Sequence, residues 1–214
     1  KNYLKNYIRI STPEVYGSND GLIDELYPMN PSTPYAISHM ATDLSMLALN
    51  KNFKLPVAIG RFANFYGPHQ QLYRIIPKTI ISILNNGILN LHGGGKSIRA
   101  FIHSEDVSRG IIKIAEKNKL GEIYHFSPEE FFSIKDIVQM ICTILDVDFN
   151  AHTQVTDDRA GKDFAYLMSS KKAHSELQWS SQISLKEGIL QTIEWAKENL
   201  DEINKLSLDY QHKE

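Results

Sequence analysis

Two short segments of the chain carry side chains that can move protons on one ligand. The segment 11–17 (Ser-Thr-Pro-Glu-Val-Tyr-Gly) offers the hydroxyl of Thr12 and the carboxylate of Glu14. Farther along, Tyr35 offers a phenol and His39 an imidazole. Residues four apart share one face of a helix, so Tyr35 and His39 can address the same ligand. The spacing therefore predicts an active site that uses acid and base groups.

A strand and a helix must hold these groups in place. Residues 7–11 are typical of a buried strand, residues 33–53 of a long helix with Pro34 in its first turn, and residues 56–62 of the next strand. A helix that connects two parallel strands forms a βαβ unit. Open α/β sheets bind ligands at the carboxyl ends of their strands, which is where Thr12 lies if this prediction holds.

The rest of the chain also alternates between the two element types, which predicts an α/β fold. The further elements expected are a helix near 75–86, strands at 89–92 and 98–102, a helix at 104–117, a strand at 122–126, a helix from residue 133 and a last helix from 184 to about 206.

Composition sets limits on function. The 214 residues are 42% hydrophobic, which is ample for one or two cores, and the net charge of -2 gives no reason to expect nucleic acid or an anionic membrane as partner. No apolar stretch approaches the roughly 20 residues that span a bilayer. The single cysteine, Cys142, fits a helix core and a reducing cytoplasm. The histidines are scattered, so we expect no metal site.

Five ordered segments carry motifs: 11–17; 30–39 (Asn-Pro-Ser-Thr-Pro-Tyr-Ala-Ile-Ser-His); 61–68 (Arg-Phe-Ala-Asn-Phe-Tyr-Gly-Pro); 93–107, with Arg99 and Asp106-Val107; and 159–166, with Arg-Ala-Gly-Lys-Asp and Tyr166. Together these motifs resemble the extended short-chain dehydrogenase/reductase family, in particular its NAD-dependent nucleotide-sugar 4,6-dehydratases, epimerases and decarboxylases.

The resemblance implies the C-terminal part of a Rossmann-type parallel sheet with a smaller α/β substrate-binding lobe. Residues 1–68 would be the remainder of the dinucleotide-binding domain and 69–214 mainly the nucleotide-sugar-binding lobe, with strand 122–126 returning to the Rossmann sheet. Family members begin with a Gly-x-x-Gly-x-x-Gly loop that holds the cofactor pyrophosphate, and no such segment precedes residue 11. We therefore expect an N-terminal half to be missing from this chain.

The resemblance also assigns roles to individual residues. The expected catalytic residues are Thr12, Glu14 and Tyr35. The expected cofactor-binding residues are Tyr35, His39, Phe62 and Ala63. The expected substrate-binding residues are Asn64, Leu89, Leu91, Arg99 and Arg159, of which the two arginines offer planar donor forks that suit a diphosphate. Each residue also has an ordinary structural alternative, such as a surface ion pair for an arginine.

The activity implied is a transient oxidation of a nucleotide-diphosphate sugar at C4, with NAD as cofactor and NADP left open. Tyr35 would take the C4 hydroxyl proton, Thr12 would hold that oxygen and Glu14 would take the C5 proton. The 4-keto sugar can then lose water, lose carbon dioxide or be reduced on its other face. The resemblance favours a 4,6-dehydratase of the dTDP-glucose or GDP-mannose type, and the sequence leaves a 4-epimerase and a UDP-glucuronate decarboxylase open as alternatives.

Two departures from the family pattern bear on this mechanism. The family lysine is replaced by His39, which is mostly neutral at pH 7, so the field that favours a Tyr35 phenolate is weaker. His39 is either a substitute contact to the cofactor ribose or a packed helix residue. Pro13 stands where dTDP-glucose 4,6-dehydratases carry an aspartic acid, and proline can protonate nothing.

Other readings of the chain remain. One alternative hypothesis is a catalytically silent nucleotide-sugar-binding fragment. Another is a plain dehydrogenase that releases an oxidised sugar. Relatives are commonly dimers built through the helix that bears the tyrosine, so we expect a homodimer through residues 33–53.

Overall fold

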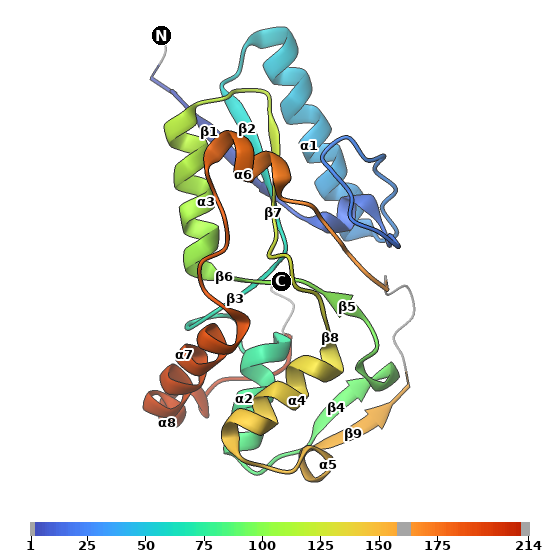
Figure 1. Ribbon diagram of the computed structural model, residues 1–214, viewed down its shortest axis with the longest axis vertical. Helices are drawn as coiled ribbons and strands as arrows, with labels where there is room; N and C mark the ends of the chain where they lie inside the picture. Colours follow the sequence, from blue (N-terminus) through green and yellow to red (C-terminus); the bar gives the residue numbers. More distant parts are fainter. Residues whose placement is uncertain (1–2, 158–163, 211–214) are drawn as a thin grey trace. The chain divides into compact units, whose positions relative to one another are not determined.

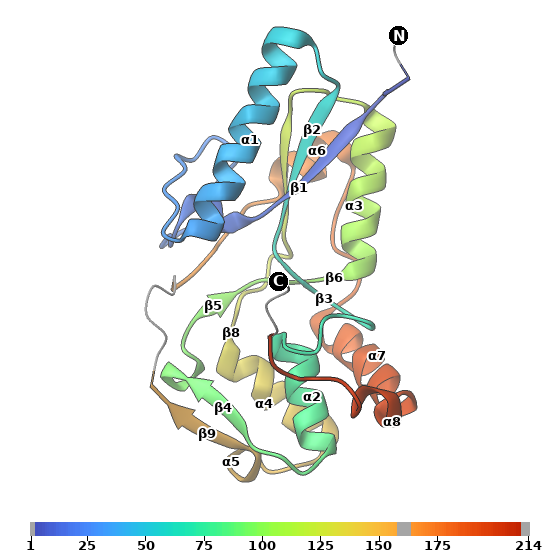
Figure 2. The same cartoon turned by 180° about the vertical axis from the view of Figure 1, so that it is seen from behind.

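The computed structural model describes residues 3–157 and 164–210, which form two compact units. The first unit draws on the ranges 1–65, 98–131 and 161–182, and the second on 66–97, 132–160 and 183–214. Figure 1 and Figure 2 show the elements from opposite sides. The expected division at residue 68 into cofactor-binding and substrate-binding parts stays a prediction.

A three-stranded parallel sheet forms the centre of the first unit, in the order β1-β2-β7. It consists of β1 (Tyr7–Ser11), β2 (Val57–Phe62) and β7 (Ile123–Phe126). Ser11 is opposite Arg61, and Phe62 is opposite Phe126, so the carboxyl ends of all three strands lie together. The α/β class and the βαβ unit thus follow the sequence-based expectation, and β7 pairs in parallel with β2.

Helix α1 (Pro34–Phe53) connects β1 to β2 and begins where the sequence predicted. Thr33 caps it, because its side chain accepts a hydrogen bond from the backbone N–H of Ala36 at 3.1 Å, and Pro34 at the first position needs no hydrogen-bond partner for its nitrogen. The helix ends at Lys54, whose backbone is left-handed with a φ of 58°. In Figures 1 and 2 the strands of the sheet run between α1 and α3.

The remaining elements of the first unit complete its core. They are the 3₁₀ helix η1 (Pro13–Tyr16), β5 (Ile98–Arg99), β6 (Phe101–His103), α3 (Ser104–Lys117) and α6 (Lys171–Leu177); β3 (Asn64–Tyr66) begins in this unit. Phe62 stacks on Phe126 with ring centres 4.7 Å apart, and Trp179 meets Phe126 edge-on at 4.9 Å. Helices α3 and α6 thereby cover an aromatic core next to the end of β2.

The second unit packs three helices around a small parallel sheet. Its elements are α2 (Ile75–Leu84), β4 (Leu89–His92), η2 (Gly93–Gly95), β8 (Phe132–Ser133), α4 (Ile134–Leu145), α5 (Phe149–His152), β9 (Thr153–Thr156), α7 (Leu185–Glu198) and α8 (Leu200–Ile203). Strands β4 and β9 pair in parallel, and α2, α4 and α7 contact one another. Ser133 and Asp136 form the capping box that starts α4.

Two sequence-based boundaries were wrong, and three short elements were not expected. The strand expected at 98–102 is two strands separated by Ala100. The last helix, expected to reach about residue 206, stops at Glu198, because the side-chain amide of Asn199 donates to the Trp195 carbonyl and α8 follows as a separate turn. Elements α5, α6 and β9 were not expected, since each is short and has too few apolar residues to show a period.

Within the described ranges 3–157 and 164–210, no helix is both long and apolar enough to cross a membrane. Cys142 is buried in α4 as expected.

Candidate active site

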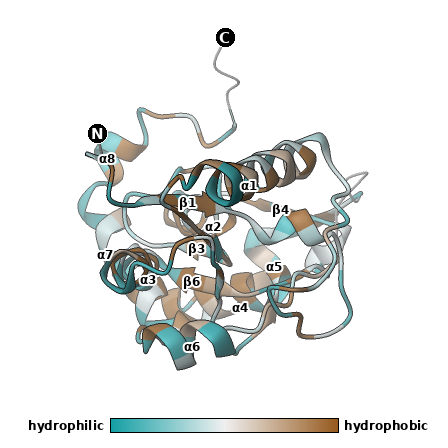
Figure 3. Ribbon diagram, turned by 90° about the horizontal axis from the view of Figure 1, so that it is seen from above, coloured by the Kyte–Doolittle hydropathy of each residue, from teal (hydrophilic) through white to brown (hydrophobic). Residues whose placement is uncertain are grey.

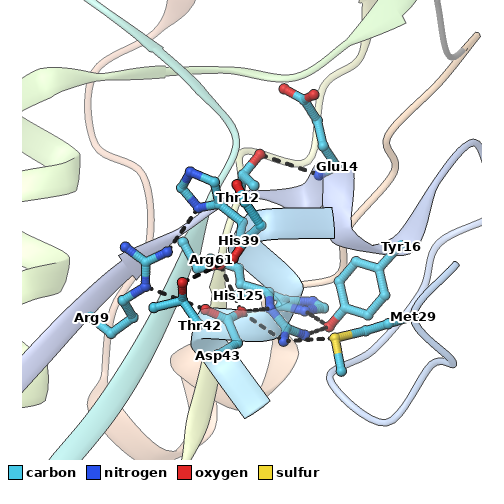
Figure 4. A network of polar contacts seen from close by, with 12 residues as sticks. Arg9, Thr12, Glu14, Tyr16, Met29, His39, Thr42, Asp43, Arg61 and His125 are labelled. Atoms are coloured by element: carbon cyan, nitrogen blue, oxygen red, sulfur yellow. Dashed lines mark hydrogen bonds and ion pairs between the residues drawn. The ribbon is translucent and has the colours of Figure 1, made fainter. Parts of the chain in front are cut away.

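Thr12 and Glu14 lie in a tight turn at the carboxyl end of β1. Thr12 is buried and caps η1, because its hydroxyl oxygen accepts the backbone N–H of Glu14 at 3.3 Å. Gly17 ends the turn with a φ of 68° and a ψ of -173°, a backbone conformation reserved for glycine. Its backbone N–H also donates to the Glu14 carbonyl at 3.1 Å. The hydroxyl and the carboxylate are thus held on one turn next to the sheet, and Figure 4 shows them together.

Tyr35 and His39 lie one helical turn apart in the first part of α1. Their ring centres are 4.4 Å apart at an interplanar angle of 47°. Tyr35 is 52% exposed, whereas His39 is partly buried. Helix α1 also packs against η1, the turn that carries Glu14. The structure therefore confirms that Tyr35 and His39 share a helical face, while their catalytic and cofactor-binding roles stay predictions.

The neighbour of His39 determines which ring nitrogen carries its proton. Nη2 of Arg9 lies 2.9 Å from Nδ1 of His39. Arginine can only donate, so Nδ1 accepts, and the proton of the neutral ring is on Nε2. Burial lowers the pKa of His39, and the nearby charge of Arg9 lowers it further, while Asp43 raises it. The imidazole is therefore neutral at pH 7 and presents Nε2–H as a donor.

Behind His39, a buried carboxylate joins β1, α1 and β2. Asp43 is fully buried and accepts from the Ser11 hydroxyl at 2.7 Å. Arg61, the residue before the last of the buried strand β2, donates to the same carboxylate from Nε at 3.2 Å and from Nη2 at 3.0 Å. Nε of Arg9 lies 3.5 Å from the other carboxylate oxygen. Figure 4 shows this cluster, in which two guanidinium groups surround one carboxylate.

The cluster continues to two neutral aromatic groups. Nη1 of Arg61 donates to the Tyr16 hydroxyl, which lies 2.6 Å from Nε2 of His125. Burial raises the pKa of Tyr16 to about 12, so its hydroxyl keeps its proton and donates it to His125. Burial also lowers the pKa of His125 to about 3, with the charge of Arg61 adding to the effect. Both groups are uncharged at neutral pH.

Sequence reasoning missed this polar cluster. Arg61 was recognised only as a motif residue, Arg9 only as part of a strand and His125 only as one of the scattered histidines, while Asp43 was not considered. Two signals were present in the sequence: an arginine inside the apolar strand 57–62, and an acid four residues after His39 on the same helical face.

The residues expected around the nicotinamide lie at and just beyond the end of β2. The Phe62 side chain is buried in the aromatic core, and Ala63 is buried with its N–H donating to the Phe126 carbonyl at 2.9 Å. Asn64 is exposed, and its backbone N–H donates to the Ala100 carbonyl at 3.2 Å. The structure places these residues at a strand end, and their contacts with ligands stay predictions.

Arg99 is held by other parts of the same unit. Its Nη1 donates to the carbonyls of Ile98 at 2.7 Å and Phe164 at 2.9 Å, and its guanidinium lies 4.2 Å from the ring centre of Tyr166. Two of the five sequence motifs, which contribute Arg99 and Tyr166, are thus brought together. Arg159 lies outside the described residues.

Leu89 and Leu91 belong to the second unit. Both are buried on β4, where Leu89 is opposite Thr153 and Leu91 is opposite Val155. Their side chains pack in that unit, and the expected course of this stretch along a nucleotide base stays a prediction. The described part of the chain contains no group of three or more metal-ligating side chains.

A parallel sheet covered by helices, with polar side chains at the carboxyl ends of its strands, is typical of Rossmann-type α/β proteins. Comparison with known families agrees: the model of the NAD dependent epimerase/dehydratase family matches residues 1–126. The chain belongs to this family.

Two of the similar proteins are named dTDP-glucose 4,6-dehydratases. A dTDP-D-glucose 4,6-dehydratase of Bos taurus is 36% identical over 202 residues, which cover 92% of this chain and 57% of that protein. The crystal structure of a dTDP-glucose 4,6-dehydratase from Streptomyces venezuelae with NAD bound is 32% identical with a TM-score of 0.88, covering 92% of this chain and 61% of that one.

A second activity occurs among the similar structures. A UDP-glucuronic acid 4-epimerase from Bacillus cereus, in complex with UDP-glucuronic acid and NAD, is 28% identical with a TM-score of 0.86 and covers 90% of this chain and 62% of that one. The chain thus spans about three-fifths of the length of these three proteins.

Proposed function

We propose that this chain carries the catalytic residues of an NAD-dependent nucleotide-sugar 4,6-dehydratase. One observation carries the proposal. Tyr35 and His39 share a face of α1, and Arg9 ties that face to the strand whose end bears Thr12 and Glu14. The relatives named dTDP-glucose 4,6-dehydratase support the choice of reaction.

The residues present fit a nicotinamide nucleotide. A half-exposed phenol at Tyr35 and an Nε2–H donor at His39 lie at the end of a parallel sheet, and a ribose offers hydroxyl groups for both. Phe62 and Ala63 would line the nicotinamide at the end of β2. When bound, NAD would accept a hydride from the sugar and return it.

The proposed contacts to the sugar nucleotide follow the sequence motifs. Asn64 and Arg99 are the proposed contacts to the diphosphate, together with Arg159. The stretch from Leu89 to Leu91 would pass along the nucleotide base. A guanidinium suits this role because it stays charged at any working pH and offers a planar fork of donors.

In the proposed reaction three side chains act on the sugar. Tyr35 as phenolate takes the proton of the C4 hydroxyl while Thr12 donates a hydrogen bond to that oxygen. The C4 ketone makes the C5 proton acidic, and Glu14 takes it, so the C6 hydroxyl can leave. Pro13 supplies no acid for this departure, so the leaving hydroxide must take its proton from another group or from water.

Epimerisation or decarboxylation is the alternative outcome, since both need the same ketone. Pro13 in place of an acid, and the similarity to a UDP-glucuronic acid 4-epimerase, favour this alternative. Mass spectrometry of the product separates the three reactions. Loss of one water supports the dehydratase, loss of carbon dioxide supports a decarboxylase, and an unchanged mass with inverted C4 supports an epimerase.

The test uses the full gene product with NAD and dTDP-glucose, GDP-mannose or UDP-glucuronate. We expect Tyr35→Phe to lower turnover by roughly 10²- to 10⁴-fold with little change in folding. Tyr7→Phe, at another exposed tyrosine of the same unit, is the matched control. Near-normal turnover by Tyr35→Phe, or net accumulation of NADH, would refute the proposed mechanism.

A silent nucleotide-sugar-binding fragment is the competing function. In the enzyme that we propose, an N-terminal part would supply the loop for the cofactor pyrophosphate. This fits the finding that the chain spans about three-fifths of the length of these relatives. Calorimetric titration of the 214-residue chain with NAD and with nucleotide sugars separates the cases. Binding of nucleotide sugar alone favours the fragment, whereas NAD binding that depends on an added upstream polypeptide favours the enzyme.

We also propose a homodimer through α1. The helix exposes apolar side chains, of which Ile37 is 50% exposed, Leu44 47% and Phe53 77%, and its apolar bands are brown in Figure 3. Exposed apolar side chains on one helix are typical of an interface. Light scattering should give a molar mass of twice the chain mass, and Leu44→Glu should reduce this value to the mass of a single chain.

A cytoplasmic location also stays a prediction, which cell fractionation would check.

A further inference from the structure

The contact between Arg9 and His39 suggests a role for a strand residue that no motif includes. Arg9 lies in β1, two residues before its end, and reaches along α1. Its Nε lies 3.5 Å from Asp43 and its Nη2 lies 2.9 Å from His39. Because these two residues are one turn apart, a single guanidinium spans the helix face below Tyr35.

The partners of Asp43 fix the position of this guanidinium. Asp43 is fully buried and is also bound by Ser11 at 2.7 Å and by Arg61 at 3.0 Å. The carboxylate of Asp43 therefore has a fixed position, and it holds the Arg9 guanidinium in place. With two guanidinium groups and one carboxylate, the cluster keeps one net positive charge, since arginine does not lose its proton in proteins.

We infer that Arg9 is a positioning residue that holds His39 as the Nε2–H tautomer and, with it, takes the place of the missing lysine next to Tyr35. Nδ1 of His39 is engaged by Arg9, so the donor Nε2–H is on the opposite side of the ring, as Figure 4 shows. The ligand that it would meet is an oxygen acceptor, such as a ribose hydroxyl. The positive charge that a lysine would bring to this position is instead on Arg9, and the imidazole ring of His39 lies between that charge and the ligand. The nature of the ligand rests on the proposed function, whereas the geometry of Arg9 and His39 does not depend on it.

Nitrogen NMR of the full chain with ¹⁵N-labelled histidine tests the geometry without any activity. Ring-nitrogen shifts show which nitrogen carries the proton, and His39→Gln identifies the His39 signals. We expect protonated Nε2 and unprotonated Nδ1, with a pKa below the ordinary value. If the unmodified protein shows a fast-exchanging mixture of tautomers, or a proton on Nδ1, the inference is overturned, whatever result the variants give.

Replacement of Arg9 then tests its part. In Arg9→Met the donor and its charge are lost, so the tautomers should mix and the pKa of His39 should rise. Tyr35 and Asp43 remain as its other neighbours. Arg9→Lys, which keeps a charge and a donor, should preserve the Nε2–H form. Arg74→Met, at an exposed arginine of the second unit, is the control. An unchanged His39 spectrum in Arg9→Met would show that Arg9 does not position the ring.

The full gene product gives a second readout. If Arg9 acts through His39 on Tyr35, then in Arg9→Met the rise of kcat with pH should move to higher pH and the affinity for NAD should fall roughly three- to tenfold. A merely structural role would lower kcat equally at every pH, which would overturn the inference. If the NMR result holds but no sugar-nucleotide reaction is found, the proposed function fails and the positioning of His39 by Arg9 stands.

Discussion

Arg61 donates two hydrogen bonds to a single carboxylate oxygen of Asp43, at 3.0 and 3.2 Å, and both side chains are almost completely shielded from water. The pair joins the middle of α1 to the sheet. Breaking a buried ion pair on one side leaves an uncompensated charge, which costs far more than an exposed pair contributes.

Asp43→Asn should therefore lower the free energy of unfolding by about 3–5 kcal/mol, because Arg9 and Arg61 then lack their counter-charge. Denaturant unfolding measures the change. Glu116→Gln removes one partner of an exposed pair with Lys113 and should cost less than about 1 kcal/mol. Equal effects of the two substitutions would contradict the importance given to the buried cluster.

The stability of the first unit should decline in acid because of His125. Its pKa is about 3 in the folded chain and about 6.5 when unfolded, so between these values the unfolded state binds more protons. Stability is then lost as the pH falls from 6.5, by up to about 1.4 kcal/mol per pH unit.

His125→Gln removes this titration and should flatten the pH dependence of unfolding between pH 6 and 4, even if the variant is less stable at pH 7. His174→Gln, at an exposed position on α6, controls for the loss of a histidine. The same slope in His125→Gln and in the unmodified chain would show that His125 is not the group responsible.

Glu14→Gln should separate the two halves of the proposed reaction. A glutamine cannot take the C5 proton, so turnover should fall by roughly 10²- to 10⁴-fold, while nucleotide-sugar binding is retained. In heavy water, the unmodified enzyme should introduce deuterium at C5 and the variant should not. Normal deuterium uptake by Glu14→Gln would assign the C5 proton to another base.

Gly17→Ala should distort the turn that carries Thr12 and Glu14. A Cβ at residue 17 would lie 2.3 Å from the backbone oxygen of Asn30, and the φ of 68° is itself unfavourable for alanine. We expect a loss of about 1–3 kcal/mol in stability together with a loss of activity. Gly21→Ala, whose Cβ would meet nothing within 4 Å, should be close to neutral and serves as the matched control.

Restoring the family lysine should fail unless Arg9 is removed as well. His39→Lys places an ammonium next to the Arg9 guanidinium, where the two like charges repel. Arg9→Met with His39→Lys should be more active and more stable than His39→Lys alone, with a coupling of about 0.5–3 kcal/mol. Strict additivity in the double-mutant cycle would contradict this expectation.

The parts of the fold that the sequence predicted are those with a repeating local signal. The strands 7–11 and 57–62 are apolar runs, and α1 begins at a threonine cap followed by proline, so both could be recognised locally. Helix α6 has only Ala173 and Leu177 in its core, which gives no visible period. The break at Ala100 could not be predicted because it depends on pairing with distant strands.

The candidate site divides in the same way. Tyr35 and His39 were found because they are four residues apart on one helix. The contacts of Arg9 with His39, and of Tyr16 with His125, join residues 30 and 109 positions apart and leave no local pattern. Burial decides which of these groups are charged, and a sequence does not show burial directly.

Because the guanidinium of Arg9 holds the imidazole of His39, changes at these two positions should be coupled during evolution. A family member that keeps lysine at the position of His39 should avoid a cation at the position of Arg9, and one that acquires histidine there should acquire arginine on the strand. Neither replacement is favourable by itself, so the two should appear as a coordinated exchange when many natural sequences are compared.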